Sequence, residues 1–292
     1  MPRSYLITGF TGADRPSDLA VARRLVCADV LARHRRMRGD RVRFALGDHV
    51  ELREPLSLSS TDVLADSGWQ RRWSDADRRM DVRPATDNDP WPARLPPPTE
   101  VVLVDAPAAA GDPAGLVREH GTDAVRWWLL RVQGTTLPRT AKDLNRGLGA
   151  LVDRIAVLVH RYRQGHQPTA APAPDLDPIR RSAPDRIAEA LAAADFPGAT
   201  EAVARIVTEA DRYFDRVRPW ELARAERAGD HAAGRDLDAI LAALLAVARV
   251  LATELTPFLP DAAARITGRC VSLAGPLAQP RPLFGTTRAG IG

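Results

Sequence analysis

The hydrophobic pattern of this chain changes character once, after about residue 137. Short apolar runs at 5–10, 42–46 and 101–104 predict buried strands in the first part. Between the first two runs, apolar residues at helical spacing predict a helix over 18–38, which ends at Gly39 and Asp40. Strand, helix and strand in that order are typical of a parallel sheet, whose ligands bind at the carboxyl ends of the strands.

Residues 51–99 interrupt this alternation. They show weak periodicity, mixed charges, the tryptophans Trp69, Trp73 and Trp91, and consecutive prolines at 96–98. The pattern predicts a partly helical stretch around 62–78 and loop after it. The prolines are typical of a linker or a polyproline turn.

From residue 138 onward the pattern predicts helices. One covers 145–162, and two more cover 187–196 and 198–216 after a proline- and alanine-rich stretch at 165–185, which we interpret as a hinge. A long helix with an apolar stripe then leads to the Pro-Phe-Leu-Pro of 257–260. We therefore predict an α/β domain over 1–137 and an all-α bundle over 138–292, with a flexible tail from about residue 285.

Composition narrows the function classes. The 292 residues carry a net charge of +4, and Lys142 is the single lysine among many arginines. Guanidinium groups suit phosphate contacts, but so small an overall charge does not by itself indicate nucleic acid. Cys27 and Cys270 are far apart, which argues against a disulfide framework and a zinc knuckle, so we expect no metal. Without a long apolar run or a signal peptide, we expect a cytoplasmic protein that does not enter the membrane.

Three motifs carry a resemblance to a known family. They are Ala-Asp-Val-Leu-Ala-Arg at 28–33, the Asp-Pro at 112–113 leading to Asp-Ala-Val-Arg-Trp-Trp-Leu-Leu at 123–130, and Tyr-Phe-Asp-x-x-x-Pro-Trp-Glu-Leu-Ala at 213–223. Together they resemble the class I methionyl-tRNA synthetases, in a truncated form. The resemblance implies a shortened Rossmann-like nucleotide-binding domain, with 51–99 in place of the family's insertion, followed by an anticodon-binding-like helical bundle.

Both ATP signatures of that family are missing. Its His-x-Gly-His motif would fall on 18–21, where the chain reads Asp-Leu-Ala-Val. Its Lys-Met-Ser-Lys-Ser loop needs two lysines, and the chain has only Lys142. Because these groups stabilise the charge of the adenylation transition state, their loss argues against ATP as a cofactor and against ordinary aminoacylation. We therefore assign no catalytic residue.

The resemblance also implies a tRNA contact in the helical bundle. Trp220 occupies the position whose indole stacks on an anticodon base, although a tryptophan that packs between two helices is an equal alternative. Arg154 matches the arginine of an Asn-x-x-x-Arg pair that contacts the anticodon, and a solvated surface arginine is the alternative reading. Ala150 stands where the family has the asparagine, and its methyl group offers no hydrogen bond to a base.

A residual amino-acid pocket is the other candidate site. Thr8, Gly9 and Phe10 follow the first predicted strand and are expected to form its floor. Asp48 and His49 follow the second strand, where the family has Gly-Thr-Asp-Glu-His. A plain turn at the strand end explains Asp48 and His49 equally well.

Three functions remain open from the sequence. The first is a tRNA-binding protein without ordinary aminoacylation activity, acting through Arg154 and Trp220. The second is a repurposed enzyme or pathway protein that uses the residual pocket on an amino acid, or takes aminoacyl-tRNA as a donor. The third is a regulatory paralogue that binds a protein partner or forms a homodimer through its apolar helices.

Overall fold

The computed structural model divides the chain into two compact units, residues 1–140 and 141–292. Their boundary falls inside helix α5 (Leu137–Leu144). The residues whose structure is described are 2–8, 18–47, 50–63, 68–85, 91–107, 111–131, 136–271 and 275–284. The predicted flexible tail from about residue 285 lies outside them.

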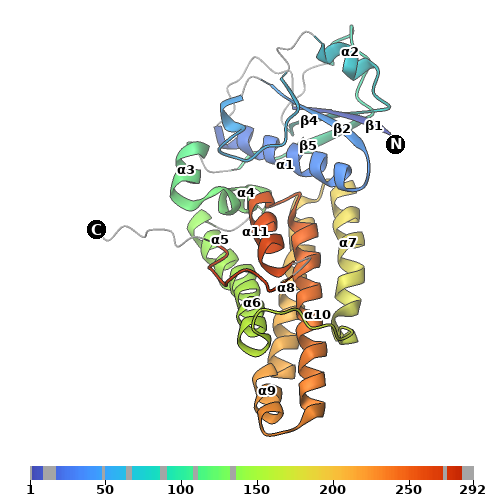
Figure 1. Cartoon of the computed structure of the whole chain (residues 1–292). Helices are drawn as coiled ribbons and strands as arrows, with labels where there is room; N and C mark the ends of the chain where they lie inside the picture. Colours follow the sequence, from blue (N-terminus) through green and yellow to red (C-terminus); the bar gives the residue numbers. More distant parts are fainter. Residues whose placement is uncertain are drawn as a thin grey trace, which may run out of the picture. The chain divides into compact units, whose positions relative to one another are not determined.

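A parallel sheet organises the first unit (Figure 1). Within the described residues it has the strand order β3-β2-β1-β4-β5. The strands are β1 (Arg3–Ile7), β2 (Arg41–Leu46), β3 (Asp62–Val63), β4 (Arg78–Pro84) and β5 (Glu100–Val104), and every pairing between them is parallel. This order is that of a doubly wound Rossmann-like fold, in which the chain reverses direction across the sheet between β1 and β4. The predicted α/β class of this part is confirmed.

Helices complete the core of this unit. Helix α1 (Asp18–Met37) packs on the sheet and also against α3 (Pro113–His120) and α4 (Thr122–Arg131). Because it is covered from several directions, nearly every residue from Leu19 to Ala32 is buried. At the start of α3, the Asp112 carboxylate accepts hydrogen bonds from the first backbone amides of the helix, which satisfies donors that would otherwise have no partner.

Two of the motifs that carry the family resemblance meet inside this core. Arg126 of α4 is fully buried, and its guanidinium lies 2.8 Å from the carboxylate of Asp29 in α1. Asp29 also accepts hydrogen bonds from Arg33 and from the backbone and hydroxyl of Ser59. Burial alone would raise the pKa of Asp29, but the two guanidinium groups and the Ser59 hydrogen bonds hold it below its ordinary value. These motif residues therefore bind the unit together.

The tryptophans of 51–99 also belong to the core of the first unit. Trp69 and Trp73 lie on the short helix α2 (Trp69–Ser74) and pack with Tyr5 and Ile7 of β1. Trp91 stacks on Trp73, with ring centroids 5.1 Å apart and an interplanar angle of 28°. The Trp73 indole N–H donates a hydrogen bond to a backbone carbonyl of the proline run. These residues therefore complete the core beside β1.

The structure corrects two predictions for this region. We expected loop after residue 78, but Arg78–Pro84 forms β4, which pairs with both β1 and β5. Its sequence is rich in arginine and has no apolar run, so the hydrophobic pattern concealed it. The expected helix at 62–78 is limited to α2, and Asp62–Val63 forms the short strand β3.

Strand β5 also differs from the expectation of a fully buried strand. It lies at one edge of the sheet, and its residues alternate between buried and exposed. Val101 and Leu103 are 41% and 55% exposed, whereas Val102 and Val104 are buried. A run of four apolar residues does not distinguish a strand covered on both faces from one covered on a single face.

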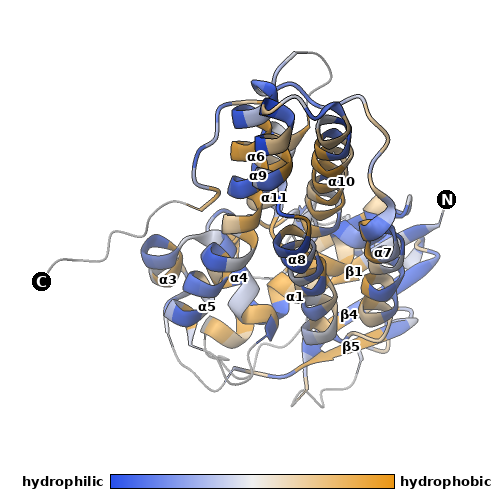
Figure 2. Ribbon diagram, turned by 90° about the horizontal axis from the view of Figure 1, so that it is seen from below, coloured by the Kyte–Doolittle hydropathy of each residue, from blue (hydrophilic) through white to orange (hydrophobic). Residues whose placement is uncertain are grey.

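The second unit is a helical bundle, as predicted, with its elements running side by side (Figure 1). Its helices are α6 (Ala150–Arg163), α7 (Asp177–Ala192), α8 (Phe196–Val217), α9 (Pro219–Arg227), α10 (His231–Leu255) and α11 (Pro260–Cys270). Helix α10 packs against α6, α7, α8, α9 and α11, and it is drawn mostly in orange in the hydropathy view of Figure 2. It is apolar around much of its circumference because its neighbours surround it.

The predicted hinge at 165–185 is too long. Helix α7 begins at Asp177, with Pro178 in its first turn and Pro184 in its interior. Proline is compatible with the first turn, because the N–H that it lacks has no partner there. Its presence inside α7 removes one helical hydrogen bond but does not end the helix, which packs along α8. The prolines therefore predicted irregular structure over residues that are helical from Asp177 onward.

A π-helical turn joins α5 to α6. Residues Asn145–Gly149 form this turn inside the predicted helix, and the Ala150 amide donates to the carbonyl of Asn145, five residues earlier. Turns of this kind are frequent at functional sites. They bring residues five apart, in place of four, onto one face of a helix.

Within the described parts of the chain, no helix is both long enough and apolar enough to cross a membrane. Likewise, no group of three or more histidine, cysteine, aspartate or glutamate side chains is arranged there to hold a metal ion. Cys27 and Cys270 are buried free thiols.

Candidate nucleic-acid interface

The corner between α8 and α9 positions Trp220. Helix α8 ends at Val217, and Arg218 takes a left-handed backbone conformation with φ of 43°. The Arg218 amide donates to the carbonyl of Phe214 and so closes the end of α8. Pro219 then begins α9, because its ring fixes the backbone angle that a first helical turn needs. The chain therefore turns within one residue, and Trp220 follows directly.

Trp220 is the large aromatic side chain that this corner presents to solvent. It is 43% exposed, whereas Phe214 near it is buried. The two ring centroids are 6.1 Å apart and the rings are tilted by 39°. An indole supported by a buried ring, with the rest of its surface open, is a rigid apolar platform on which another flat ring can stack.

Arg154 of α6 reaches the same aromatic pair. Its guanidinium carbon lies 4.8 Å from the centroid of the Phe214 ring, a cation–π contact. One of its nitrogens lies 2.9 Å from the carboxylate of Asp211, one turn before Phe214 in α8. The structure thus brings Arg154 and Trp220, 66 positions apart in the sequence, onto one buried phenylalanine.

Asp211 holds Arg154 only loosely. The side chains of Arg154 and Asp211 remain 39% and 33% exposed. Partial burial raises the pKa of Asp211 above its ordinary value, and the attraction of Arg154 offsets this only in part. Ion pairs as exposed as this one contribute about 0–1 kcal/mol. An incoming phosphate or base edge can therefore compete with Asp211 for the guanidinium.

Ala150 lies on the same face of the helix as Arg154. Ala150 precedes Arg154 by one α-helical turn. Asn145 precedes Ala150 by one π-helical turn, which places Asn145 on the same face. Asn145 is exposed and supplies the kind of side-chain amide that Ala150 lacks. The face therefore carries an amide, a methyl group and a guanidinium in successive turns.

Sequence reasoning missed Phe214 and Asp211, which connect the two predicted residues. Phe214 is part of the Tyr-Phe-Asp that begins the recognised motif, six residues before Trp220. Its place inside α8 could have been derived from the helical spacing, but its contact with α6 could not. Contacts between helices far apart in the sequence depend on the packing of the bundle.

Thr8 is the described member of the predicted amino-acid pocket. It follows β1, at the point where the chain reverses direction across the sheet, and is almost fully buried. Among the described residues, no group forms a hydrogen bond with its hydroxyl oxygen. Gly9, Phe10, Asp48 and His49 lie outside the described residues.

The residues that stand in place of the missing ATP signature His-x-Gly-His belong to a helix of the first unit. Residues 18–21 open α1, and the side chains of Leu19 and Val21 are buried in the core of the first unit. Lys142, the single lysine, is exposed on α5. Leu19 and Val21 offer no hydrogen-bond donor to a phosphate.

Known proteins similar in sequence to this chain are methionine–tRNA ligases. That of Clostridium acetobutylicum is 28% identical over 169 residues, which cover 53% of this chain and 26% of the ligase. That of Streptococcus pyogenes serotype M3 is 31% identical over 170 residues, covering 53% of this chain and 25% of the ligase. The chain thus matches about a quarter of the length of these relatives. No protein-family profile matches it.

Solved structures with the same fold are methionyl-tRNA synthetases of Mycobacterium tuberculosis. The complex with methionyl-adenylate aligns with a TM-score of 0.81 and 14% identity, covering 97% of this chain and all of that chain. The apo form aligns with a TM-score of 0.78 and 15% identity, covering 98% of each chain. At this identity the likeness concerns the fold, and it agrees with a Rossmann-like domain joined to a helical bundle.

Proposed function

We propose that this chain, which is related to methionine–tRNA ligases and resembles a truncated methionyl-tRNA synthetase, binds tRNA through its helical unit without catalysing ordinary aminoacylation. Trp220 stacks on a base of the tRNA, and Arg154 contacts a neighbouring phosphate or base edge. A tRNA partner agrees with the cytoplasmic location expected from the sequence.

The observation that supports this proposal best is the exposed indole of Trp220 beside the Phe214–Arg154 contact. If Trp220 served only to pack two helices together, its ring would be covered. Here Phe214 fills the buried position and Trp220 is left in part open. Stacking of a nucleic-acid base on an aromatic side chain contributes about 1–3 kcal/mol per base.

The second support is the composition of the surroundings. Arg154 supplies a positive charge next to the platform, held by a weak and half-exposed ion pair. An aromatic surface next to an available guanidinium is the combination that single-stranded segments of nucleic acid recognise. Ala150 removes one hydrogen-bonding group from this surface, so we expect affinity for tRNA with reduced discrimination between anticodons.

The test is a comparison of Trp220→Ala with the unaltered chain. Binding of methionine tRNA, and of the same tRNA with a changed anticodon, is measured by fluorescence anisotropy at two salt concentrations. We expect Trp220→Ala to weaken binding by about 1–3 kcal/mol, or roughly 5- to 150-fold. Trp69→Phe serves as the control, because Trp69 is buried in the other unit.

Two results would overturn the proposal. One is the absence of salt-sensitive tRNA binding by the unaltered chain at low salt. The other is equal affinity of the Trp220→Ala variant and the unaltered chain. Thermal unfolding of both proteins shows whether a loss of binding reflects a loss of structure.

The absence of ordinary aminoacylation rests on residue identity. The apolar side chains of Leu19 and Val21, in the place of the family's ATP-binding motif, supply no donor for the phosphates. Such donors, aimed at developing charge, typically contribute factors of about 10²–10³ each to the rate. Methionine-dependent exchange of pyrophosphate into ATP is the assay, and a rate above background would refute this part.

A second function is favoured by one observation, the buried hydroxyl of Thr8 at the carboxyl end of β1, to which no described residue is hydrogen-bonded. A buried polar atom without a partner is costly unless a ligand or a water molecule satisfies it. A small amino acid bound at this end of the sheet would do so. Calorimetric titration with methionine, repeated with Thr8→Val, tests this alternative, and heat that is unchanged by Thr8→Val would exclude it.

A further inference from the structure

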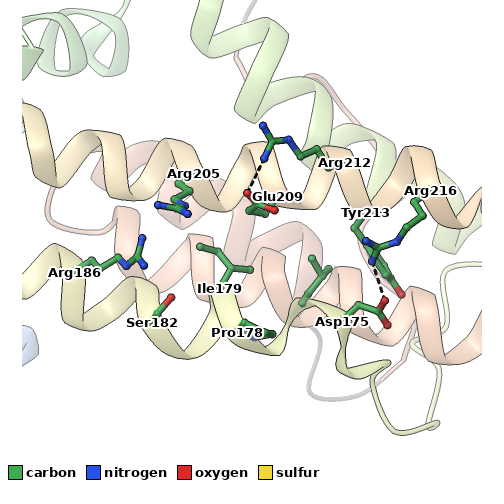
Figure 3. A pocket seen from close by; sticks show the side chains of 11 residues that line it. Asp175, Pro178, Ile179, Ser182, Arg186, Arg205, Glu209, Arg212, Tyr213 and Arg216 are labelled. Carbon is green, nitrogen blue, oxygen red and sulfur yellow. Dashed lines mark hydrogen bonds and ion pairs between the residues drawn. The ribbon is translucent and has the colours of Figure 1, made fainter.

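A groove runs between α7 and α8 of the helical unit (Figure 3). Its cavity volume is about 420 Å³. Its apolar floor includes Leu176 and Ile179, and its lining carries four arginines and the two carboxylates of Asp175 and Glu209. The arginines are Arg186 on α7 and Arg205, Arg212 and Arg216 on α8. The lining therefore has a net charge of two positive units.

The groove lies on a different side of α8 from the Trp220 platform. Successive residues of an α-helix are rotated by about 100°, which places Arg205, Glu209 and Arg212 roughly opposite Asp211 and Phe214. The groove is thus a separate surface, and what it binds does not depend on whether Trp220 stacks on a base.

Two of the arginines pair with no carboxylate in the part of the chain that the structure describes. Arg186 and Arg205 are exposed, and within the described residues neither makes an ion pair or a side-chain hydrogen bond. They lie across from each other at one end of the groove in Figure 3. Two like charges facing one another destabilise a protein unless an anion sits between them.

The other two arginines have partners that can be exchanged. Arg212 pairs with Glu209 at 3.0 Å and Arg216 with Asp175 at 2.8 Å, and both arginine side chains are well exposed. Exposed pairs of this kind contribute about 0–1 kcal/mol, so a phosphate can displace the carboxylates at little cost. Guanidinium groups also match phosphate oxygens in a two-pronged geometry.

The spacing of the arginines fits several phosphates in a row. From Arg205 to Arg216 the axis of α8 rises by roughly 16 Å, at 1.5 Å per residue. A single phosphate does not reach arginines this far apart. We propose that the α7–α8 groove binds the phosphate groups of an extended polyanion, either the backbone of an RNA strand or a small linear polyphosphate.

The experiment measures binding of two probes to the full chain, a labelled single-stranded octauridylate and inorganic tripolyphosphate. The groove variant is Arg186→Gln with Arg205→Gln, which removes two charges that have no partner among the described residues and leaves the core untouched. The control is Arg181→Gln with Arg235→Gln, which removes the same charge from exposed sites outside the groove. Both are repeated with Trp220→Ala, so that stacking does not contribute.

We expect the groove variant to bind octauridylate about tenfold more weakly at 50 mM salt, with the slope of log affinity against log salt reduced by about 1.4. We expect the control variant to change the affinity for octauridylate and the salt slope only slightly. A loss confined to octauridylate identifies the RNA backbone as the source of the phosphates, and a loss for both probes identifies linear polyphosphates in general.

Equal binding by the groove variant and the control, for both probes, overturns the inference. Its failure is distinct from failure of the tRNA proposal, because the effect is measured in the Trp220→Ala background. If octauridylate binds in the groove while Trp220→Ala leaves tRNA affinity unchanged, the groove stands and the stacking role falls.

Discussion

Arg126 and Arg154 each lie in a segment that resembles the same family, yet their surroundings differ in almost every respect. Arg126 is fully buried in the first unit, where it pairs with Asp29 and donates to the carbonyl of Leu56. Arg154 is 39% exposed in the second unit, against Asp211 and the Phe214 ring. A motif residue supports the fold where its charge is held in a buried pair. Where the pair is exposed, the charge remains accessible to a ligand.

The largest effect that separates the two arginines is on stability. Arg126→Met leaves the Asp29 carboxylate buried without its main partner, and breaking such a pair typically costs about 3–5 kcal/mol. Urea unfolding followed by circular dichroism measures the loss. If Arg126→Met unfolds at the same urea concentration as the unaltered chain, the structural role assigned to Arg126 is wrong.

Arg154→Gln is expected to behave in the opposite way. Its ion pair contributes no more than about 1 kcal/mol, so the urea midpoint shifts little. Binding of tRNA weakens, and the dependence of log affinity on log salt falls by about 0.7–0.9, because one phosphate contact is lost. A variant that unfolds as Arg126→Met does, or binds tRNA unchanged, would remove the distinction between the two arginines.

The carboxylates that pair with the two arginines, Asp29 and Asp211, are expected to change the stability of the chain with pH in opposite directions. The pKa of Asp29 is lowered in the folded chain, so the stability that Asp29 contributes is present above about pH 3.9 and is lost as the pH falls through its folded pKa. The pKa of Asp211 is raised, so its contribution is present below about pH 3.9 and is lost as the pH rises through its folded pKa.

Asparagine substitutions test these signs. At pH 7, Asp29→Asn should destabilise the chain strongly, whereas Asp211→Asn should change the free energy of unfolding by less than about 1 kcal/mol. Urea unfolding at pH 7 measures both. Repeating it at about pH 3 tests the sign for Asp29, because the cost of Asp29→Asn should be smaller below the ordinary carboxyl pKa. A strong destabilisation by Asp211→Asn would show that the Arg154 pair also supports the fold.

The smallest expected effect is a gain in the preference for one anticodon over another. Ala150→Asn restores an amide one turn before Arg154, on a half-buried helix face where asparagine costs about 0.5 kcal/mol of helix stability relative to alanine. We expect it to increase the preference for the methionine anticodon over a changed one. Ala150→Gln is the matched control with the amide displaced by one methylene group. Equal anticodon preference in all three proteins would separate this position from base recognition.

The sequence allowed much of the fold to be predicted, because β1, β2, α1 and α10 carry continuous apolar patterns. Strand β4 was missed because its arginines and aspartate hide a central position in the sheet. The beginning of α7 was missed because Pro178 and Pro184 are usually read as breaks. In each case the neighbouring elements stabilise a structure that the local pattern disfavours.

The candidate site likewise has residues that the sequence predicts and residues that only the structure brings together. Trp220 and Arg154 follow from the family resemblance, and the structure adds the contact of both with Phe214. Arg186 and Arg205 carry no motif and lie on different helices, so only the packing of α7 against α8 reveals that they face one groove. Pairs formed by tertiary packing leave no local signal in a single sequence.

The π-helical turn at Asn145–Gly149 amounts to one surplus residue in an otherwise regular helix. Removing Gly147 would let the backbone close into an uninterrupted α-helix in which Asn145 stands four residues before Ala150, so Asn145 would stay in line with Ala150 and Arg154. Closing the turn into an α-helix without a deletion would instead rotate Asn145 by about 100° away from that line. The surplus residue and the wide turn thus compensate each other, and the phase of the helix decides which polar groups share that line.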